Sequence, residues 1–266
     1  MKTYPEMVCS RKDRLAKSFY STHQGKFIMH RCVSLRHLLC FAVATAIFIS
    51  NNSVESVTAA EKLNCPPPGF KALFNGKNLD GWKGLVGSPK SRAKMSAEDL
   101  AKAQKEADAR IHQHWKAVDG VLVFDGKGKN LCTKKLYGNF EMYVDWKIKA
   151  KGDSGIYLRG SPQVQIWDPA LSKQNAVGSG GLYNNKKNPS KPLVVADNPV
   201  GEWNTFYIKM VGERVTVKLN GKLVVDNTIL ENYWERDKPI YPKESIELQN
   251  HGNTLYFRNI YVKELP

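Results

Sequence analysis

Strict alternation of apolar and polar residues over 140–148 is the feature that most constrains the fold of this chain. In the run FEMYVDWKI, aromatic and aliphatic side chains occupy every second position. Because successive side chains of a β-strand point to opposite faces, this pattern predicts a strand with one buried and one polar face. Further strand-like runs follow at 203–211, 214–219, 245–250 and 254–265.

The dipeptide Asn220-Gly221 indicates how such strands are connected. It lies between VTVKL and KLVVD and accepts the positive φ that a two-residue hairpin turn requires. Many short strands joined by turns predict an all-β fold, and we expect an antiparallel jelly-roll β-sandwich. The segment 96–113 instead predicts a helix, since Ser96 with Asp99 is an acidic variant of the capping box. We expect this surface helix to be inserted between the first strands, on the sandwich edge.

Residues 1–60 have the order of a leader with a secretory signal. Basic residues precede an apolar run at 38–50, and the small residues Ala59-Ala60 follow it. The run is shorter than the roughly 20 residues that a membrane span needs. We therefore expect cleavage near Ala59-Ala60 and export to the periplasm or the exterior, with an uncleaved anchor as the alternative. Met29 is an alternative start to Met1.

The remaining chain divides into a Pro-rich linker over 61–69 and one domain over 70–266. Apart from the leader, this chain holds two cysteines, Cys65 and Cys132. An oxidising compartment permits a disulfide between them, and two unpaired thiols are the alternative. The net charge of +15 is scattered along the sequence and no nucleic-acid reader motif is present. We expect no nucleic-acid partner and no stable membrane span in the mature chain.

The segment 152–168, GDSGIYLRGSPQVQIWD, predicts two short adjacent strands with one strongly polar face. If Ile156, Leu158, Val164 and Ile166 face the core, the other face is exposed to a ligand. That face carries Tyr157, Arg159, Gln163, Gln165 and Trp167, with Asp153 and Asp168 at the strand ends. Planar donors and acceptors beside flat rings suit a polyhydroxylated ligand, so we expect an oligosaccharide or glycoside substrate.

Two later segments add polar side chains by the same argument. In 246–252, IELQNHG, a buried Ile246 and Leu248 leave Glu247, Gln249 and His251 together on the opposite face. In the last strand, Arg258 lies opposite the apolar residues. If all these strands share one curved sheet, their polar faces merge into one groove. A histidine beside a carboxylate is suited to acid-base chemistry. We expect Arg159, Glu247 and His251 to be catalytic, and the other polar residues named above to bind substrate.

Each of these residues also has a purely structural interpretation. Arg159 could form an ion pair, Glu247 and His251 could face solvent, and Asp168 could shape the turn before Pro169. There is no HExxH motif, no zinc-spaced Cys/His quartet and no calcium loop of the DxDxDG type. No cofactor is therefore evident. A divalent cation such as Ca²⁺, held by carboxylates and carbonyls, remains an alternative.

Seven segments in sequence order resemble the 3-keto-disaccharide hydrolase domain family. They are FKALFNGKNLDGW (70–82), GNFEMYVDWKI (138–148), DSGIYLRG (153–160), PQVQIWD (162–168), GEWN (201–204), LNGKLVVD (219–226) and IELQNHG with YFRNIYVKEL (246–265). The resemblance covers most of the chain after the leader. It implies a concanavalin-like jelly roll and cleavage of glycosides already oxidised at carbon three of the sugar.

The resemblance implies proton abstraction at carbon two, loss of the anomeric oxygen by elimination, and addition of water. For that reaction we assign Arg159 to the keto or enolate oxygen and Glu247 or His251 to the proton transfers. Gln163 departs from a pattern in which many members have Glu, and Glu247 stands where many have Gly. The alternative function is a non-catalytic carbohydrate-binding sandwich that uses the same groove.

Overall fold

Residues 62–266 are the part of the chain that the computed structural model describes, and β-strands dominate it. The predicted leader, its cleavage site and the alternative start lie outside these residues. One set of strands is β1 (Lys71–Ala72), β3 (Trp115–Val118), β4 (Val121–Phe124), β6 (Phe140–Ile148), β9 (Asn204–Val211), β10 (Arg214–Leu219), β11 (Lys222–Ile229) and β13 (Leu255–Glu264). The other set is β2 (Trp82–Gly84), β5 (Leu131–Thr133), β7 (Asp153–Leu158), β8 (Ser161–Trp167) and β12 (Glu247–Leu248). The helices are α1 (Pro89–Arg92), α2 (Ala97–His114) and a 3-10 turn, η1 (Asn175–Val177).

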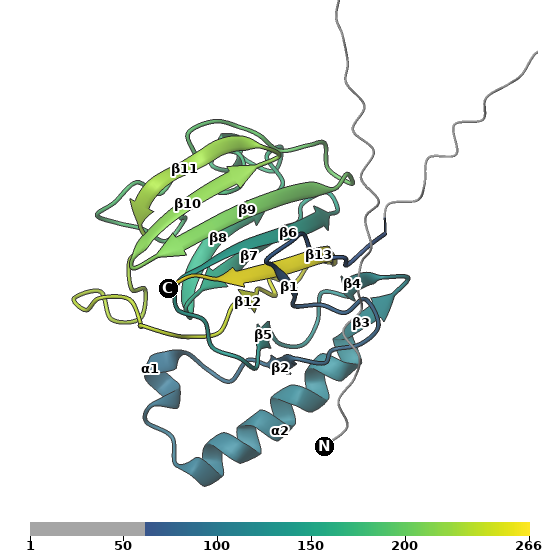
Figure 1. The fold of residues 1–266 in the computed structure, drawn as a ribbon, viewed down its shortest axis with the longest axis vertical. Coiled ribbons are helices and arrows are strands. Elements are labelled where there is room, and N and C mark those ends of the chain that lie inside the picture. The colour runs from purple at the N-terminus through teal and green to yellow at the C-terminus, as the bar shows by residue number, and fades with distance from the viewer. Residues whose placement is uncertain (1–61) are drawn as a thin grey trace, which may run out of the picture. The chain divides into compact units, whose positions relative to one another are not determined.

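The two sets form two antiparallel sheets, as expected for a jelly-roll sandwich. The larger sheet has the order β11-β10-β9-β6-β13-β4-β3, with β1 paired to β13. The smaller sheet has the order β2-β5-β12-β7-β8. Figure 1 shows the smaller sheet behind the larger one, so the segments 153–167 and 247–248 lie in a different layer from β13. None of the helices within 62–266 combines the length and apolarity needed to cross a bilayer.

The core between the sheets is built from the alternating residues that the sequence indicates. On β6, Phe140, Met142 and Val144 are completely buried. On the smaller sheet, Ile156 and Val164 are also completely buried, and they are register partners between β7 and β8. The predicted strand faces are therefore correct here. They put the polar residues of β7 and β8 on the outer face of the smaller sheet.

The hairpin and the inserted helix also agree with the sequence. Asn220 and Gly221 have φ angles of 50° and 81° between β10 and β11, as a two-residue turn requires. Ser96 caps α2, because its hydroxyl oxygen accepts a hydrogen bond from the Asp99 N–H at 3.0 Å.

The inserted helix docks on β2, which forms one edge of the smaller sheet. Asp108 accepts the Gly84 N–H at 2.9 Å, and Gln104 donates to the Gly84 carbonyl at 2.8 Å. A Cβ at Gly84 would lie 2.4 Å from the Ala107 carbonyl oxygen, so only glycine permits this close approach. The edge strand is thereby covered by a helix.

The structure also tests two predicted long-range contacts, the common curved sheet and the disulfide between Cys65 and Cys132. Leu255 and Phe257 of β13 face the core, opposite Arg258, but β13 belongs to the larger sheet, so the prediction of one common curved sheet is wrong. Cys132 is a buried free thiol in β5, so it forms no disulfide with Cys65.

Candidate functional site

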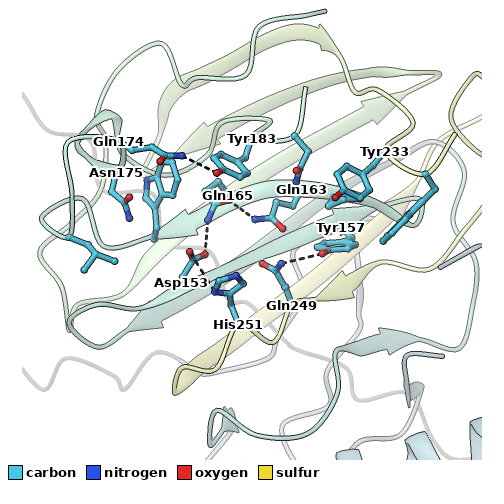
Figure 2. Close-up of a pocket in the computed structure, with 15 residues that line it drawn as sticks. Asp153, Tyr157, Gln163, Gln165, Gln174, Asn175, Tyr183, Tyr233, Gln249 and His251 are labelled. Atoms are coloured by element: carbon cyan, nitrogen blue, oxygen red, sulfur yellow. Dashed lines mark hydrogen bonds and ion pairs between the residues drawn. The ribbon is translucent and has the colours of Figure 1, made fainter. Parts of the chain in front are cut away.

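A cavity of about 380 Å³ opens on the outer face of the smaller sheet (Figure 2). Strands β7 and β8 contribute its floor, and the turn after β12 contributes one side. Its other walls come from the segment after β8 and from Tyr233 and Trp234 after β11. Seven of the predicted site residues line it: Asp153, Tyr157, Gln163, Gln165, Trp167, Gln249 and His251.

Asp153 and His251 lie next to each other at one side of this cavity (Figure 2). The Asp153 Oδ2 lies 3.7 Å from the His251 Nδ1. The carboxylate is the more sheltered partner, with 26% of its side chain exposed against 57% for the imidazole. Burial raises the pKa of Asp153, and the nearby His251 opposes that shift. At 3.7 Å this contact is electrostatic and too long for a hydrogen bond.

A chain of carboxamides supports the Asp153 carboxylate from the floor of the cavity. Gln163 donates a hydrogen bond to the Oε1 of Gln165, and the Nε2 of Gln165 donates to Asp153 Oδ1 at 2.8 Å. The Gln165 amide also donates to the Ser154 carbonyl at 3.0 Å, so its orientation is determined on both sides. A Cβ at Gly155 would lie 2.7 Å from the carboxamide carbon of Gln163, so this arrangement requires glycine there.

Tyr157 presents a hydroxyl on the same floor. Its oxygen accepts a hydrogen bond from the Gln249 Nε2 at 3.1 Å, so its own hydrogen can be donated to a ligand. Burial raises the pKa of Tyr157 to about 12, and the hydroxyl therefore stays protonated at neutral pH. The Gln249 Oε1 is buried and has no hydrogen-bond partner within residues 62–266. The Gln249 Oε1 is thus an acceptor without a partner, and the Tyr157 hydroxyl beside it has a hydrogen free to be donated.

Aromatic rings form the far wall of the cavity. Trp167 is buried, its indole N–H donates to the Gly178 carbonyl at 2.8 Å, and its ring contacts Tyr183 edge to face at 5.4 Å between centroids. Tyr183 in turn accepts a hydrogen bond from Gln174 at 2.9 Å. Flat rings beside amide groups match the two surfaces of a sugar, one apolar and one hydroxylated.

The structure places Arg159 elsewhere, contrary to the prediction. It lies in the turn between β7 and β8 with a φ of 51°, where strand alternation no longer determines direction. Its guanidinium donates to the carbonyl oxygens of Tyr241 and Gly212, the latter at 2.6 Å. Arg159 is 5% exposed and does not line the cavity, so its role is to join chain segments.

Glu247 lies on the predicted face but does not reach the cavity. Glu247 pairs with Tyr157 on one side and with Cys132 on the other, and Cys132 pairs in turn with Lys83. Of this row across the smaller sheet, Tyr157 lines the cavity. Glu247 is 1% exposed, and burial raises its pKa to about 8. Its Oε2 has no hydrogen-bond partner in the described part of the chain. Direct proton transfer between Glu247 and a ligand in the cavity is therefore not supported.

The remaining two predicted binding residues have structural contacts. Asp168 accepts the backbone N–H groups of Lys151 and Ala170, both at 2.8 Å, and so shapes the turn after β8. Arg258 lies on the outer face of the larger sheet, where its Nε is 3.2 Å from Asp145 and its guanidinium lies 4.2 Å from the Trp203 ring centroid. The site and Arg258 are thus on opposite sides of the sandwich.

Several lining residues were missed, and all of them except Pro162 of β8 lie outside strands. They are Pro162, Leu171, Gln174, Asn175, Tyr183, Asn184, Tyr233 and Trp234. Most belong to the long connections after β8 and β11. The length of these connections, rich in amide and aromatic residues, was the available signal, because long ordered loops next to strand ends often carry function.

No metal centre is visible among residues 62–266, where no group of three His, Cys, Asp or Glu side chains is arranged to hold an ion. The divalent cation considered above stays a prediction.

Comparisons with known proteins place this cavity in context. The profile of a family described as 3-keto-alpha-glucoside-1,2-lyase-like domain matches residues 69–263. The 3-keto-disaccharide hydrolase of Bacteroides thetaiotaomicron is 24% identical over 271 residues, covering 79% of this chain and 85% of that protein. Two crystal structures of candidate glycosyl hydrolases from Parabacteroides distasonis are also similar. The first has a TM-score of 0.57 at 25% identity, covering 77% of this chain and 100% of that one. The second has 0.55 at 27% identity, covering 75% and 85%.

Proposed function

The chain belongs to the 3-keto-alpha-glucoside-1,2-lyase-like domain family, and we propose that it is a hydrolase that cleaves the glycosidic bond of 3-keto-glycosides. The relative named as a 3-keto-disaccharide hydrolase supports this substrate class. The cavity supports it independently, because carboxamides and aromatic rings line a hollow large enough for a sugar ring.

The ketone at carbon three turns the cleavage into acid-base chemistry. A base removes the hydrogen on carbon two, and the electron pair of that bond forms an enolate with its negative charge on the oxygen of carbon three. When the ketone re-forms, the substituent on carbon one leaves with the bonding pair and takes up a proton. Water then adds to carbon one and a proton returns to carbon two. The sum is hydrolysis without the paired carboxylates of ordinary glycosidases.

We assign the proton transfers to His251 with Asp153 as its partner. The Nε2 of His251 takes the hydrogen from carbon two and delivers it to the leaving oxygen. The Asp153 carboxylate, 3.7 Å from Nδ1, stabilises the imidazolium that forms through its negative charge. Asp153 is itself supported by Gln165, so the carboxylate is positioned before a ligand arrives.

Tyr157 takes the role that we first gave to Arg159. Its hydroxyl donates to the oxygen on carbon three, where negative charge develops in the transition state. Gln249 orients the phenol by donating to its oxygen. The second amide hydrogen of Gln163 then binds a sugar hydroxyl.

The observation that carries this proposal is the contact between Asp153 and His251 in the same cavity as the Tyr157 hydroxyl. The chain offers a matched control, since His114 Nδ1 lies 2.9 Å from Asp125 Oδ2 and neither residue lines the cavity. We expect His251→Ala to lower kcat on a 3-keto-glucoside by about 10²- to 10⁴-fold, the usual contribution of a general base. We expect His114→Ala to keep wild-type activity.

Sugar release is measured with purified protein, with and without a chelator. Release lost in both histidine variants alike, or saturable binding of the 3-keto-glucoside without turnover by the wild type, would contradict the proposal. The second result would favour the carbohydrate-binding alternative. Loss of activity with chelator and its return with Ca²⁺ would support the predicted cation.

A further inference from the structure

A second, smaller cavity adjoins the first. Its volume is about 150 Å³, and four residues line both cavities: Gln165, Trp167, Gln174 and Tyr183. The wall between them includes the hydrogen bond from Gln174 to the Tyr183 hydroxyl, which is 2.9 Å long (Figure 2). The two cavities therefore lie next to each other and share this wall.

The two cavities differ in chemistry. Carboxamides, a carboxylate and an imidazole line the larger one. The smaller one shares the carboxamides of Gln165 and Gln174 with it. Its other lining is more apolar and consists of Val177, Pro192, glycine backbone and the rings of Trp167 and Tyr183, with Ser190 and Lys191 at its polar side. The indole N–H of Trp167 is already bonded to Gly178, so the ring offers its carbon surface.

Backbone makes part of this lining rigid. Gly181 pairs with β8, because its carbonyl accepts the Gln165 N–H at 3.0 Å. A Cβ at Gly181 would lie 2.5 Å from the Ser190 carbonyl oxygen and 2.9 Å from Pro192 Cδ. The two backbone segments are therefore in direct contact, and the width of the small cavity is determined by the fold.

We infer that the small cavity binds the leaving group of the glycoside, and that it fits an aryl group with one six-membered ring. This rests on the proposed function, which puts the sugar in the large cavity. A hollow of about 150 Å³ is large enough for a single benzene ring, and the rings of Trp167 and Tyr183 give this one apolar surface. Aromatic ligand rings also pack well edge to face or offset against tryptophan and tyrosine.

The test compares phenyl and methyl 3-keto-glucosides, which share the sugar and differ in the leaving group. Val177→Phe fills the small cavity from one side, and the exposed Lys191→Phe fills it from the other. We expect each variant to lower the ratio of phenyl to methyl kcat/KM at least ten-fold. Val211→Phe, at an exposed position on β9, is the matched control and should leave the ratio unchanged.

A binding measurement separates this inference from the proposed function. Phenol alone is titrated into the wild type and the three variants and followed by NMR. Weaker phenol binding in the Val177 and Lys191 variants than in the Val211 variant supports the cavity assignment even if no glucoside is turned over. An unchanged kcat/KM ratio with both substrates turned over would overturn it. The inference would also be overturned if the filling substitutions weakened the binding of glucose and left the binding of phenol unchanged.

Discussion

The Asp153 carboxylate lies 3.7 Å from the His251 imidazole, although β7 and the turn after β12 are far apart in the sequence. Strand pairing brings them together. Glu247 pairs with Tyr157 and Leu248 with Ile156, and the Gln249 N–H then donates to the Gly155 carbonyl at 2.9 Å. Continuing this antiparallel register carries the chain from Gln249 to His251 while β7 runs back to Asp153. The pair is thus a product of the sheet register.

The ionisation of Asp153 should be visible in the pH dependence of the reaction. Burial raises the pKa of this carboxyl above its ordinary value of 3.8. As the pH falls through the raised pKa, Asp153 takes up a proton and no longer stabilises the imidazolium. We expect kcat/KM to decline as the pH falls through this raised pKa. Asp153→Asn should lower kcat and remove that contribution from the profile. A profile of the same shape in the variant would exclude this role.

Tyr157→Phe should separate transition-state stabilisation from binding. The hydroxyl contacts charge that develops only on the enolate, so its removal is expected to lower kcat about 10²-fold with little change in KM. Tyr207→Phe is a suitable control, because Tyr207 also has a pKa raised to about 12 by burial but lies in the larger sheet. Steady-state kinetics on a 3-keto-glucoside measure both variants. Equal kcat values for the two would argue against a hydroxyl donor at position 157.

Glu247 should influence the pH dependence of stability. Its pKa is about 8 in the folded protein, mainly because of burial, against an ordinary value of 4.5. A raised carboxyl pKa means that the stability present below pH 4.5 is lost progressively as the pH rises from 4.5 to about 8. Replacing Glu247 with the neutral, isosteric Gln avoids this loss. At pH 8 to 9 we expect the variant to gain on the order of 3 kcal/mol in the free energy of unfolding.

Denaturant unfolding at several pH values measures this gain. Below pH 4.5, where the wild-type carboxyl is neutral in both states, the two proteins should have similar stability. Glu264→Gln is a control at an exposed carboxylate that is paired with Lys135 and should leave the pH dependence unchanged. A wild type and a Glu247→Gln variant whose stability curves run parallel from pH 4 to 9 would show that Glu247 is not buried as a neutral acid.

Much of the site could be predicted because the alternation of side chains between the two faces is a local property of each strand. The direction of Tyr157, Gln163, Gln165 and Trp167 depends on their own strands, whose apolar partners are fully buried. This alternation predicts which face of its strand a residue occupies, but it does not predict which sheet the strand joins. Arg258 was therefore assigned to the site, although Asp145 is its register partner in the larger sheet.

The segments that cover the outer face of the smaller sheet could not be predicted either. Glu247 faces outward from the smaller sheet, yet the chain around Arg92 and Glu244 lies close enough to influence its charge. Tyr183 and Tyr233 reach the cavity from long connections whose paths depend on contacts remote in sequence, such as the bridge between Leu182 and Val164. Such contacts leave no periodic pattern in the sequence.

Arg159 provides a last test, because its predicted and observed roles differ in what a substitution should change. As a catalytic residue it would lower kcat when replaced. As a buried donor to the carbonyls of Tyr241 and Gly212, it should instead support the fold. Arg159→Met keeps the apolar stem and leaves both acceptors without their charged donor. We expect a loss of about 3–6 kcal/mol in the free energy of unfolding, from two hydrogen bonds to a charged group worth ~1.5–3 kcal/mol each.

Arg214→Met is the control for this prediction, since Arg214 is an exposed arginine with a hydrogen bond to the Asn227 carbonyl at 2.9 Å. That change should alter stability by less than about 1 kcal/mol, as is usual for surface contacts. Under conditions where Arg159→Met is folded, its kcat and KM on a 3-keto-glucoside should match those of the wild type. A folded variant with normal stability and a greatly reduced kcat would return Arg159 to the catalytic site, because only contact with the reacting sugar could account for that combination.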